Sequence, residues 1–265
     1  KKIIMKEFTI AAIQMDVKLG DIEFNLRTAQ TLIDKAAKAK PQLITLPEMF
    51  ATGFDYPCIK KMASETYNEL IAFLINNSHK YNCYIVGGTI PEMAEDKLYN
   101  TSFVSSPDRK IIGAQRKIHP FTLTEEHKYF AGGESLNVIN CPLAKLGIVI
   151  CYDIRFPEVA RALTLKGAEV LICPAQFPAP RAHHWEILIK SRAIENQVYA
   201  IGNNRVGGRK TKFFGKSMVA SPHGEAVKEL GDQEGVLIAS IDLEKIKKER
   251  EQIPALLERK PEIYQ

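Results

Sequence analysis

The chain alternates between two hydrophobic periods from one end to the other. Short apolar runs of the kind found in buried strands are separated by segments whose apolar residues recur at helical spacing. Residues 8–15 (FTIAAIQM) are typical of a strand, and residues 21–40 are typical of an amphipathic helix. No linker rich in proline, glycine or serine interrupts this order. The pattern therefore predicts a single domain over residues 1–265.

Strands and helices continue to alternate toward the C-terminus, and two regions resemble hairpins. Further strands are predicted at residues 42–48, 83–88, 146–150, 169–173 and 198–204, and helices at residues 65–81, 157–166, 183–197 and in the charged C-terminal segment. The first hairpin joins residues 99–106 to 110–117, and the second surrounds the turn PHGE at residues 222–225. Helical connections favour parallel strands, whereas hairpins are antiparallel. We therefore expect an α/β fold with mixed sheets covered by helices.

Composition and charge exclude several classes of protein. Hydrophobic residues make up 45% of the chain and charged residues 25%, which is ordinary for a globular domain and argues against disorder. The net charge of +5 comes from charges mixed along the chain, so we interpret basic clusters such as residues 245–250 as solvated helix faces and expect no nucleic-acid partner. No apolar run reaches the roughly 18 residues of a membrane span. Residues 1–15 lead into a strand without a cleavage site, so we expect neither membrane insertion nor secretion.

Cysteine usage bears on compartment and metal binding. The chain has an odd number of cysteines without a CxxC pair: Cys58, Cys83, Cys141, Cys151 and Cys173. This usage favours reduced thiols and hence a cytoplasmic location. The six histidines do not combine with these cysteines at the spacing of a structural zinc site, so we expect no metal.

Three chemically active residue types each end a predicted strand. Glu48, Lys117 and Cys151 lie at the carboxyl ends of their strands, where α/β folds gather catalytic and binding groups. At a strand-to-helix turn, helix N-terminal N–H groups would favour the thiolate of Cys151, and Glu48 would accept the thiol proton. Lys117 and the backbone N–H of Tyr152 would stabilise an oxyanion. This interpretation predicts a hydrolase with a cysteine nucleophile.

Each of the three residues also has a purely structural interpretation. A lone cysteine that ends an apolar strand is commonly a buried small hydrophobe. Glu48 follows a proline and fits an exposed loop, and Lys117 fits an edge strand that its charge keeps from pairing with other chains. The strand context alone leaves both interpretations open.

Several sequence blocks carry a resemblance to a known family. In chain order, LPEMFATGFD contains Glu48, RKIHPF contains Lys117 and CYDIRFPEVAR contains Cys151. These blocks and the gaps between them resemble the nitrilase superfamily of carbon–nitrogen hydrolases. The segments AAIQMD near the start, and RAIENQVYAIGNNRVG and FFGKSMVASPHGE near the end, extend the resemblance over nearly the whole chain.

The resemblance implies a fold and a set of catalytic roles. The implied fold is a four-layer α-β-β-α sandwich that pairs into a homodimer. Cys151 is implied to be the acyl-forming nucleophile, Glu48 its general base, and Lys117 the residue that stabilises the tetrahedral intermediate. These residue types carry out every step by acid–base and nucleophilic chemistry, so no cofactor is needed.

A further glutamate is implied in the loop between the lysine and the cysteine. The polar residues 118–134 predict a surface loop of the kind that often carries function. Spacing within this loop favours Glu126 over Glu125 as the family's fourth catalytic residue. The alternative for Glu126 is an ordinary loop carboxylate that pairs with His127 or Lys128.

The sequence around the nucleophile also indicates a substrate class. The segments CYDIRFPE, PAQFPAPRAHHW and SRAIENQ look most like the omega-amidase-like branch, which hydrolyses the terminal amide of small dicarboxylic acid monoamides such as 2-oxoglutaramate. A basic side chain would bind the substrate carboxylate by bidentate pairing, and Arg155 is the first candidate and Arg181 the second. The alternative for Arg155 is a structural ion pair with Asp153 or Glu158.

Two aromatic residues are candidates for the pocket walls, because small-molecule sites are mostly apolar. They are Phe177 and Trp185. Phe177 stands where this branch commonly has a tryptophan before the proline, and the smaller ring would change the shape of the pocket. Trp185 fits a place in the hydrophobic core equally well.

Other functions share parts of this pattern. An N-carbamoyl amino acid hydrolase, an aliphatic amidase or a nitrilase would use the same three residues. A non-catalytic member that binds a protein partner is a different class, and the intact set of Glu48, Lys117 and Cys151 argues against it. A thiol redox sensor is a further class, ranked last because no second cysteine is placed in the sequence to resolve a sulfenic acid.

Overall fold

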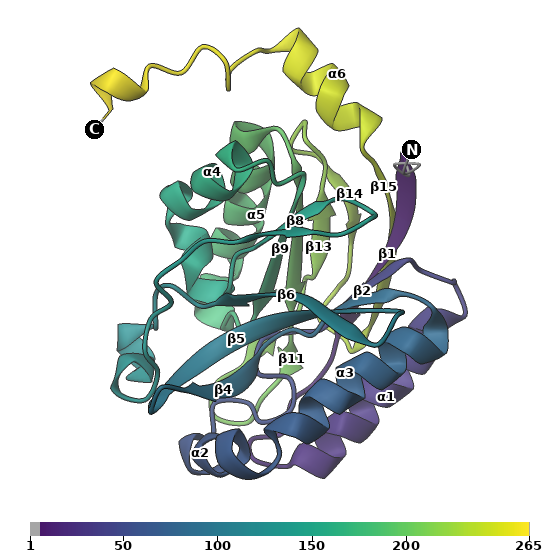
Figure 1. Cartoon of the computed structure of the whole chain (residues 1–265), viewed down its shortest axis with the longest axis vertical. Coiled ribbons are helices and arrows are strands. Elements are labelled where there is room, and N and C mark those ends of the chain that lie inside the picture. The colour runs from purple at the N-terminus through teal and green to yellow at the C-terminus, as the bar shows by residue number, and fades with distance from the viewer. Residues whose placement is uncertain (1–5, 265) are drawn as a thin grey trace.

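Two β-sheets lie between layers of helices in the computed structural model, which describes residues 6–264 (Figure 1). Residues 1–5, on which part of the expectation about secretion rests, lie outside the described residues. Within residues 6–264, no helix is both long enough and apolar enough to cross a membrane.

The first sheet has seven strands of mixed direction. It contains β1 (Glu7–Gln14), β2 (Leu43–Thr45), β3 (Tyr84–Val86), β4 (Ile90–Ala94), β5 (Lys97–Ser106), β6 (Lys110–Arg116) and β15 (Gly235–Asp242), in the order β15-β1-β2-β3-β5-β4 with β6 paired to β5. The strands β1, β2 and β3 are parallel, and the hairpin β5–β6 is antiparallel. The predicted hairpin is therefore confirmed, whereas β4 was not predicted from the sequence.

The second sheet has six strands and is also mixed. It contains β7 (Val138–Asn140), β8 (Lys145–Ile148), β9 (Val170–Ala175), β10 (Tyr199–Asn204), β13 (Met218–Ala220) and β14 (Ala226–Glu229), in the order β14-β13-β10-β9-β8-β7. Its central strands β8, β9 and β10 are parallel. A short separate pair joins β11 (Val206–Gly207) to β12 (Phe213–Phe214).

The principal helices are α1 (Ile22–Ala37), α2 (Tyr56–Glu65), α3 (Tyr67–Tyr81), α4 (Pro157–Leu165), α5 (Ala182–Asn196) and α6 (Glu244–Gln252). The side chain of Asp21 begins α1 by accepting a hydrogen bond from the N–H of Phe24 at 3.1 Å, as an N-cap residue does. The sequence predicted these helices to within a few residues, except for α2. Asp55 caps α2 through the N–H of Cys58 at 2.9 Å.

Three of the hydrophobic clusters separate four layers. Along β1, Phe8, Ile10 and Ala12 pack against the second sheet, whereas Ala11 and Ile13 pack against helices α1 and α3. A third core lies between the second sheet and helices α4 and α5. Successive side chains of a strand point to opposite faces, so each sheet is buried on both sides. The α-β-β-α sandwich implied by the resemblance is confirmed.

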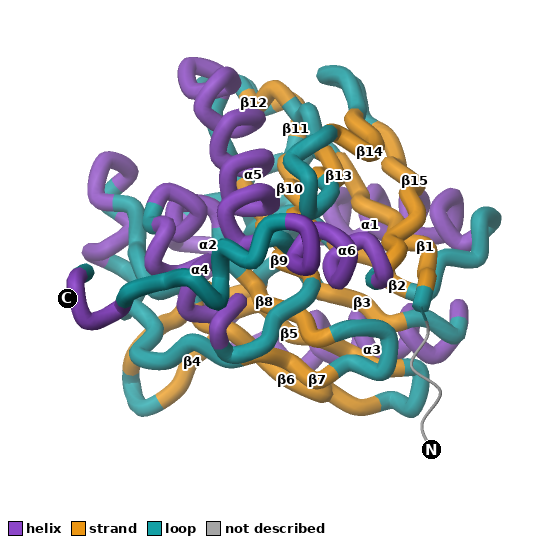
Figure 2. Tube along the Cα trace, turned by 90° about the horizontal axis from the view of Figure 1, so that it is seen from above, coloured by secondary structure: helices purple, strands orange, loops and turns teal. Residues whose placement is uncertain are grey.

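The chain after α6 leaves the sandwich and extends toward the side that carries α4 (Figure 1; Figure 2). This segment exposes apolar side chains at Ile253, Leu257, Ile263 and Tyr264. It lies away from the strand ends at which the predicted catalytic residues are found.

Candidate active site

Three of the predicted catalytic side chains meet in a buried cluster. Lys117 follows β6 directly, Glu48 lies three residues after β2, and Glu126 lies in a short 3₁₀ helix, Glu126–Lys128. The Nζ atom of Lys117 donates to Glu48 Oε1 at 2.8 Å and to Glu126 Oε2 at 2.7 Å. The side chains of Lys117, Glu48 and Glu126 are only 2%, 0% and 1% exposed. A lysine between two carboxylates leaves this cluster with one net negative charge.

The turn after β2 is shaped to place Glu48. Gly88 has a φ of +53°, and a Cβ atom there would lie 2.0 Å from the carbonyl oxygen of Pro47, so only glycine fits. The hydroxyl of Thr89 accepts a hydrogen bond from the N–H of Met49 at 2.8 Å. Glu48 Oε2 accepts from the N–H of Gln176 at 3.0 Å. These contacts fix the carboxylate from three segments that are far apart in the sequence.

Helix α2 supports the loop that carries Glu126. The hydroxyl of Tyr56 donates to the carbonyl of Thr124 at 2.9 Å, and its ring stacks on Tyr129 at 3.8 Å. Glu126 Oε2 accepts from the N–H of Phe121 at 2.7 Å. The loop therefore turns one of its acidic side chains inward, and the prediction of a simple surface loop at residues 118–134 was incomplete.

The structure separates the two glutamates of this loop. Glu126 is buried against Lys117, whereas Glu125 is exposed and pairs with Lys128. The alternative for Glu126 was an exposed ion pair within the loop, and Glu125 forms such a pair with Lys128 instead.

Cys151 begins a 3₁₀ helix, Cys151–Arg155, three residues after β8. Its φ is +45°, a left-handed conformation that residues other than glycine rarely adopt and that is frequent at functional turns. Its thiol lies close enough to Glu48 for the charge of that carboxylate to raise the pKa of the thiol. The nucleophile candidate therefore lies within the electrostatic influence of the same carboxylate that Lys117 contacts.

The thiol form of Cys151 is favoured over the thiolate. Burial raises the pKa of this thiol well above its ordinary value, and the charge of Glu48 raises it further, whereas the charge of Lys117 lowers it only in part. This raised pKa does not support the prediction that N–H groups of the following helix favour the thiolate. A base that accepts the proton during attack is needed instead.

The pKa values of Glu48 and Lys117 are also shifted. Burial raises the pKa of Glu48, the charge of Lys117 opposes that rise, and the charge of Glu126 adds to it. Burial alone would lower the pKa of Lys117, but Glu48 and Glu126 outweigh it and raise that pKa well above its ordinary value. Lys117 is therefore a permanent cation at the site, and Glu48 is a carboxylate with increased affinity for a proton.

A second cysteine lies beside the nucleophile candidate. Cys173, in the neighbouring strand β9, is 2% exposed and belongs to the hydrophobic cluster against which Cys151 packs. This proximity could not be predicted from the sequence, because the parallel pairing of β8 and β9 brings the two residues together. Burial raises the pKa of both thiols, which disfavours the reactive thiolate form.

Asp153 joins the segment after Lys117 to the helix that begins with Cys151. Its carboxylate accepts hydrogen bonds from the N–H groups of Ile118 and His119, at 3.1 and 2.8 Å. The role of Asp153 was not predicted from the sequence. Tyr152, between Cys151 and Asp153, contributes a backbone N–H for which no acceptor is found among residues 6–264.

Arg155 and Arg181 lie near each other beside the aromatic residues of this region. The guanidinium of Arg155 is 5.2 Å from the Phe177 ring and hydrogen-bonds to His184 Nδ1 at 3.3 Å. Burial and the charge of Arg181 lower the pKa of Arg155. Among the described residues, no carboxylate lies within 4.0 Å of either guanidinium, so the alternative ion pair of Arg155 with Asp153 or Glu158 does not form.

The two aromatic candidates are placed differently from each other. Trp185 is 0% exposed, donates from Nε1 to the carbonyl of Lys216 at 2.8 Å, and packs in the core beneath α5. This burial favours the alternative place of Trp185 in the core over a place in the wall of a pocket. Phe177 is 3% exposed and lies between Trp185 and Arg155, with 5.2 Å between the Phe177 and Trp185 ring centroids.

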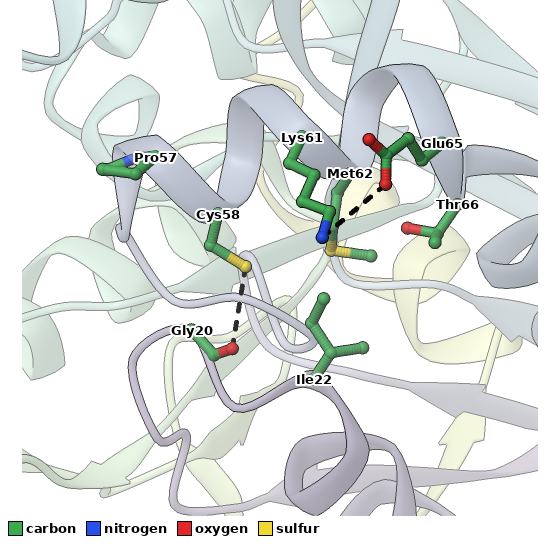
Figure 3. Close-up of a pocket in the computed structure, with 8 residues that line it drawn as sticks. All are labelled: Gly20, Ile22, Pro57, Cys58, Lys61, Met62, Glu65 and Thr66. Atoms are coloured by element: carbon green, nitrogen blue, oxygen red, sulfur yellow. Dashed lines mark hydrogen bonds and ion pairs between the residues drawn. The ribbon is translucent and has the colours of Figure 1, made fainter.

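A separate cavity of about 480 Å³ lies between the start of α1 and helix α2, and contains none of the predicted site residues (Figure 3). Its lining includes Cys58, whose sulfur lies 3.7 Å from the carbonyl oxygen of Gly20, and the ion pair Lys61–Glu65 at 3.8 Å. Across residues 6–264, no group of three or more His, Cys, Asp and Glu side chains is arranged to hold a metal ion.

A cysteine with a carboxylate base and a fixed cation beside it can form and break an acyl–sulfur bond, which is the chemistry of cysteine-dependent hydrolases. The chain belongs to the carbon-nitrogen hydrolase family, whose model matches residues 9–251. It is 34% identical to the 2-oxoglutaramate amidase of Bacillus subtilis over 97% of this chain and 100% of that protein. It is also 34% identical to the omega-amidase NIT2 of Danio rerio, over 98% and 97% of the two chains.

Solved structures show the same relationship. The chain is similar to Nit3 of Saccharomyces cerevisiae, a member of branch 10 of the nitrilase superfamily, with a TM-score of 0.89, 32% identity and coverage of 98% of both chains. A carbon-nitrogen hydrolase from Helicobacter pylori G27 superimposes with a TM-score of 0.91 at 28% identity, over 98% of this chain and 97% of that one. The predicted superfamily is therefore confirmed.

Proposed function

We propose that this enzyme hydrolyses the terminal amide of small dicarboxylic acid monoamides, such as 2-oxoglutaramate, through a thioester on Cys151. The observation that carries the proposed chemistry is the buried cluster in which Lys117 contacts both Glu48 and Glu126, beside the Cys151 thiol whose pKa the charge of Glu48 raises. The substrate class is supported by relatives named 2-oxoglutaramate amidase and omega-amidase over nearly the full chain.

The first half of the reaction forms the thioester. Glu48 takes the thiol proton while the sulfur of Cys151 attacks the amide carbon, and the carbonyl electron pair moves to oxygen. The ammonium of Lys117 and the free N–H of Tyr152 stabilise the oxyanion. The carbon–nitrogen bond then breaks, and protonated Glu48 returns its proton to the nitrogen, which leaves as ammonia.

The second half regenerates the enzyme. Glu48 takes a proton from water, the resulting hydroxide attacks the thioester carbon, and the carbon–sulfur bond breaks. The departing sulfur regains a proton from Glu48, and the carboxylic acid product leaves. In both halves Glu126 holds Lys117 in place and keeps it protonated, since two carboxylates face one ammonium.

The remote carboxylate of the substrate would bind at Arg155 and Arg181. Two guanidinium groups close together without a carboxylate partner favour an anion, and each can bind it in a bidentate way. Phe177 lies beside Arg155 and would contact the carbon chain of the substrate. Because the ring of Phe177 is smaller than that of a tryptophan at the same position, it would change the shape of the pocket and hence the preferred substrate.

Ammonia release from a panel of amides tests this proposal. The panel contains 2-oxoglutaramate, succinamate, an N-carbamoyl amino acid, a neutral aliphatic amide and a nitrile. We expect the two anionic monoamides to have the highest kcat/KM. Preference for the carbamoyl compound, with release of carbon dioxide, or for the neutral amide or nitrile would replace the proposed substrate class. Silence across the panel in folded protein would reject it.

Three further proposals concern the whole protein. We infer that residues 1–265 form one domain, a proposal supported by the shared core between the two sheets. We also propose a cytoplasmic location, which is supported by five cysteines that are all free.

We further propose that the protein forms a homodimer. This proposal is supported by the apolar side chains that are exposed after α6. Sedimentation of the purified protein tests the homodimer, and a monomer at micromolar concentration would contradict it.

A further inference from the structure

Asn100 lies in β5, in the middle of the candidate active site, and touches both of its glutamates. Its Nδ2 atom donates to Glu48 Oε1 at 2.9 Å and to Glu126 Oε1 at 3.0 Å. The residue is 1% exposed. We propose that Asn100 is a positioning residue, which holds the two carboxylates in place around Lys117 and thereby sets the protonation of Glu48.

The geometry makes Asn100 a second bridge parallel to the lysine. Lys117 Nζ contacts the same two oxygen atoms, Glu48 Oε1 at 2.8 Å and Glu126 Oε1 at 3.0 Å. Both N–H bonds of the Asn100 amide are thereby used on carboxylates. The amide orientation follows from this demand for donors, since its Oδ1 atom has no hydrogen-bond partner among the described residues.

Asn100 also fixes the cation that it accompanies. Its backbone carbonyl accepts a hydrogen bond from the N–H of Lys117 at 2.8 Å, just beyond the end of the β5–β6 ladder. One residue of β5 therefore sets the position of Glu48, Lys117 and Glu126 together. Among the described residues, Asn100 and Lys117 are the two whose side chains donate to both glutamates.

A neutral amide suits this position for an electrostatic reason. Glu48 and Glu126 share one lysine in a buried site, so they repel each other and would tend to take up a proton or move apart. An amide donor stabilises both charged forms without titrating itself. A second lysine would neutralise the cluster and lower the basicity of Glu48, and an apolar side chain would leave two buried oxygens short of donors.

The test compares Asn100→Leu, which keeps the approximate shape and removes both donors, with Asn100→Ser and Ser102→Ala. Ser102 is a matched control, because it is buried on the same face of β5, two residues further on, and its hydroxyl has no partner among residues 6–264. Each variant is assayed with succinamate from about pH 4 to about pH 9, and kcat and KM are determined separately at each pH. Thermal unfolding establishes that each is folded.

For Asn100→Leu we expect kcat to fall about 10- to 100-fold, KM to change by less than about threefold, and the acid limb of kcat/KM to move up by about one pH unit. The reason is that the carboxylate form of Glu48 loses the hydrogen bond from Asn100, while Glu126, Lys117 and the Cys151 thiol remain as ionisable neighbours. Asn100→Ser keeps one donor, so its kcat and the position of its acid limb should lie between those of Asn100→Leu and the parent protein. Ser102→Ala should have the same kcat and the same acid limb as the parent protein. If Asn100→Leu does not fold, the pH profile of kcat/KM for Asn100→Ser tests the proposal.

Two results would overturn the proposal. One is an acid limb that stays in place in a folded Asn100 variant, and the other is a loss of kcat that Ser102→Ala reproduces. The inference rests on the proposed use of Glu48 as base, so a readout without substrate is added. Alkylation of Cys151 by iodoacetamide, followed by mass spectrometry against pH, should show the same shift. A shifted alkylation profile in a protein silent toward the amide panel would reject the substrate class and leave Asn100 in its role.

Discussion

The carboxyl of Glu48 lies beside the thiol of Cys151, and its charge raises the pKa of that thiol, whereas the thiol lowers the pKa of Glu48. The site therefore rests as a thiol beside a carboxylate, rather than as a preformed thiolate beside a carboxylic acid. Lys117 does not reverse this balance, because Glu126 offsets its charge. Attack on an amide then requires proton transfer to Glu48 in the same step, and this requirement leads to the predictions that follow.

Substitution of Cys151 separates catalysis from stability. Cys151→Ala and Cys151→Gly should both abolish ammonia release, because neither has a nucleophile. At a φ of +45°, glycine is relaxed and alanine is strained, so Cys151→Gly should be more stable than Cys151→Ala by about 1 kcal/mol. Denaturant unfolding measures the difference, and Cys58→Ala, a cysteine of α2 outside the site, should keep full activity. Turnover by Cys151→Ala would reject the mechanism.

As the pH rises through the pKa of Glu48, activity should increase and the stability of the folded protein should decrease. Glu48 must be ionised to act as base, so the acid limb of kcat/KM should lie above its ordinary pKa of 4.5. Between 4.5 and the raised value, the folded protein holds a proton that the unfolded chain has released, so ionisation of Glu48 lowers the stability as the pH rises. Glu48→Gln should remove activity and also this fall in stability. An acid limb at or below 4.5 would contradict the raised pKa.

The adjacent glutamates of the active-site loop form a matched pair for mutation. Glu126→Gln should lower kcat at least about 100-fold, because the buried Lys117 loses one of two carboxylate partners and shifts toward Glu48. Glu125→Gln removes only an exposed ion pair with Lys128 and should change kcat by less than about twofold. Steady-state kinetics with succinamate compares them. Equal effects would mean that the loop acts as a whole, without a special role for Glu126.

Removal of an arginine should discriminate between anionic and neutral amides. For Arg155→Ala, kcat/KM should fall about 10- to 150-fold for succinamate and much less for a neutral amide of the same length, because a hydrogen bond to a charged group contributes about 1.5–3 kcal/mol. Arg155→Lys should recover part of the loss, and Arg181→Ala tests the second guanidinium. Equal losses for both amides would assign Arg155 a structural role.

Much of the fold and part of the candidate site were predictable from local sequence. The period of the apolar residues predicted most strands and helices, whereas α2 and β4, which are only 10 and 5 residues long, were among the elements that were not predicted. The three blocks around Glu48, Lys117 and Cys151 predicted the superfamily. The sequence also favoured Glu126 over its neighbour, whereas the inward turn of its side chain follows from the support of α2 and the hydrogen bond to Phe121.

The sequence by itself determined the order of the elements, the residue types at the strand ends and the family, because periodicity, turn residues and motif blocks are local properties. Only the tertiary structure decided which side chains meet. The bridge from Asn100 to both glutamates, the place of Trp185 in the core and the raised pKa of the Cys151 thiol arise where segments distant in the chain are packed together. Burial and Coulomb interactions act through space, and chain position does not record which groups share that space.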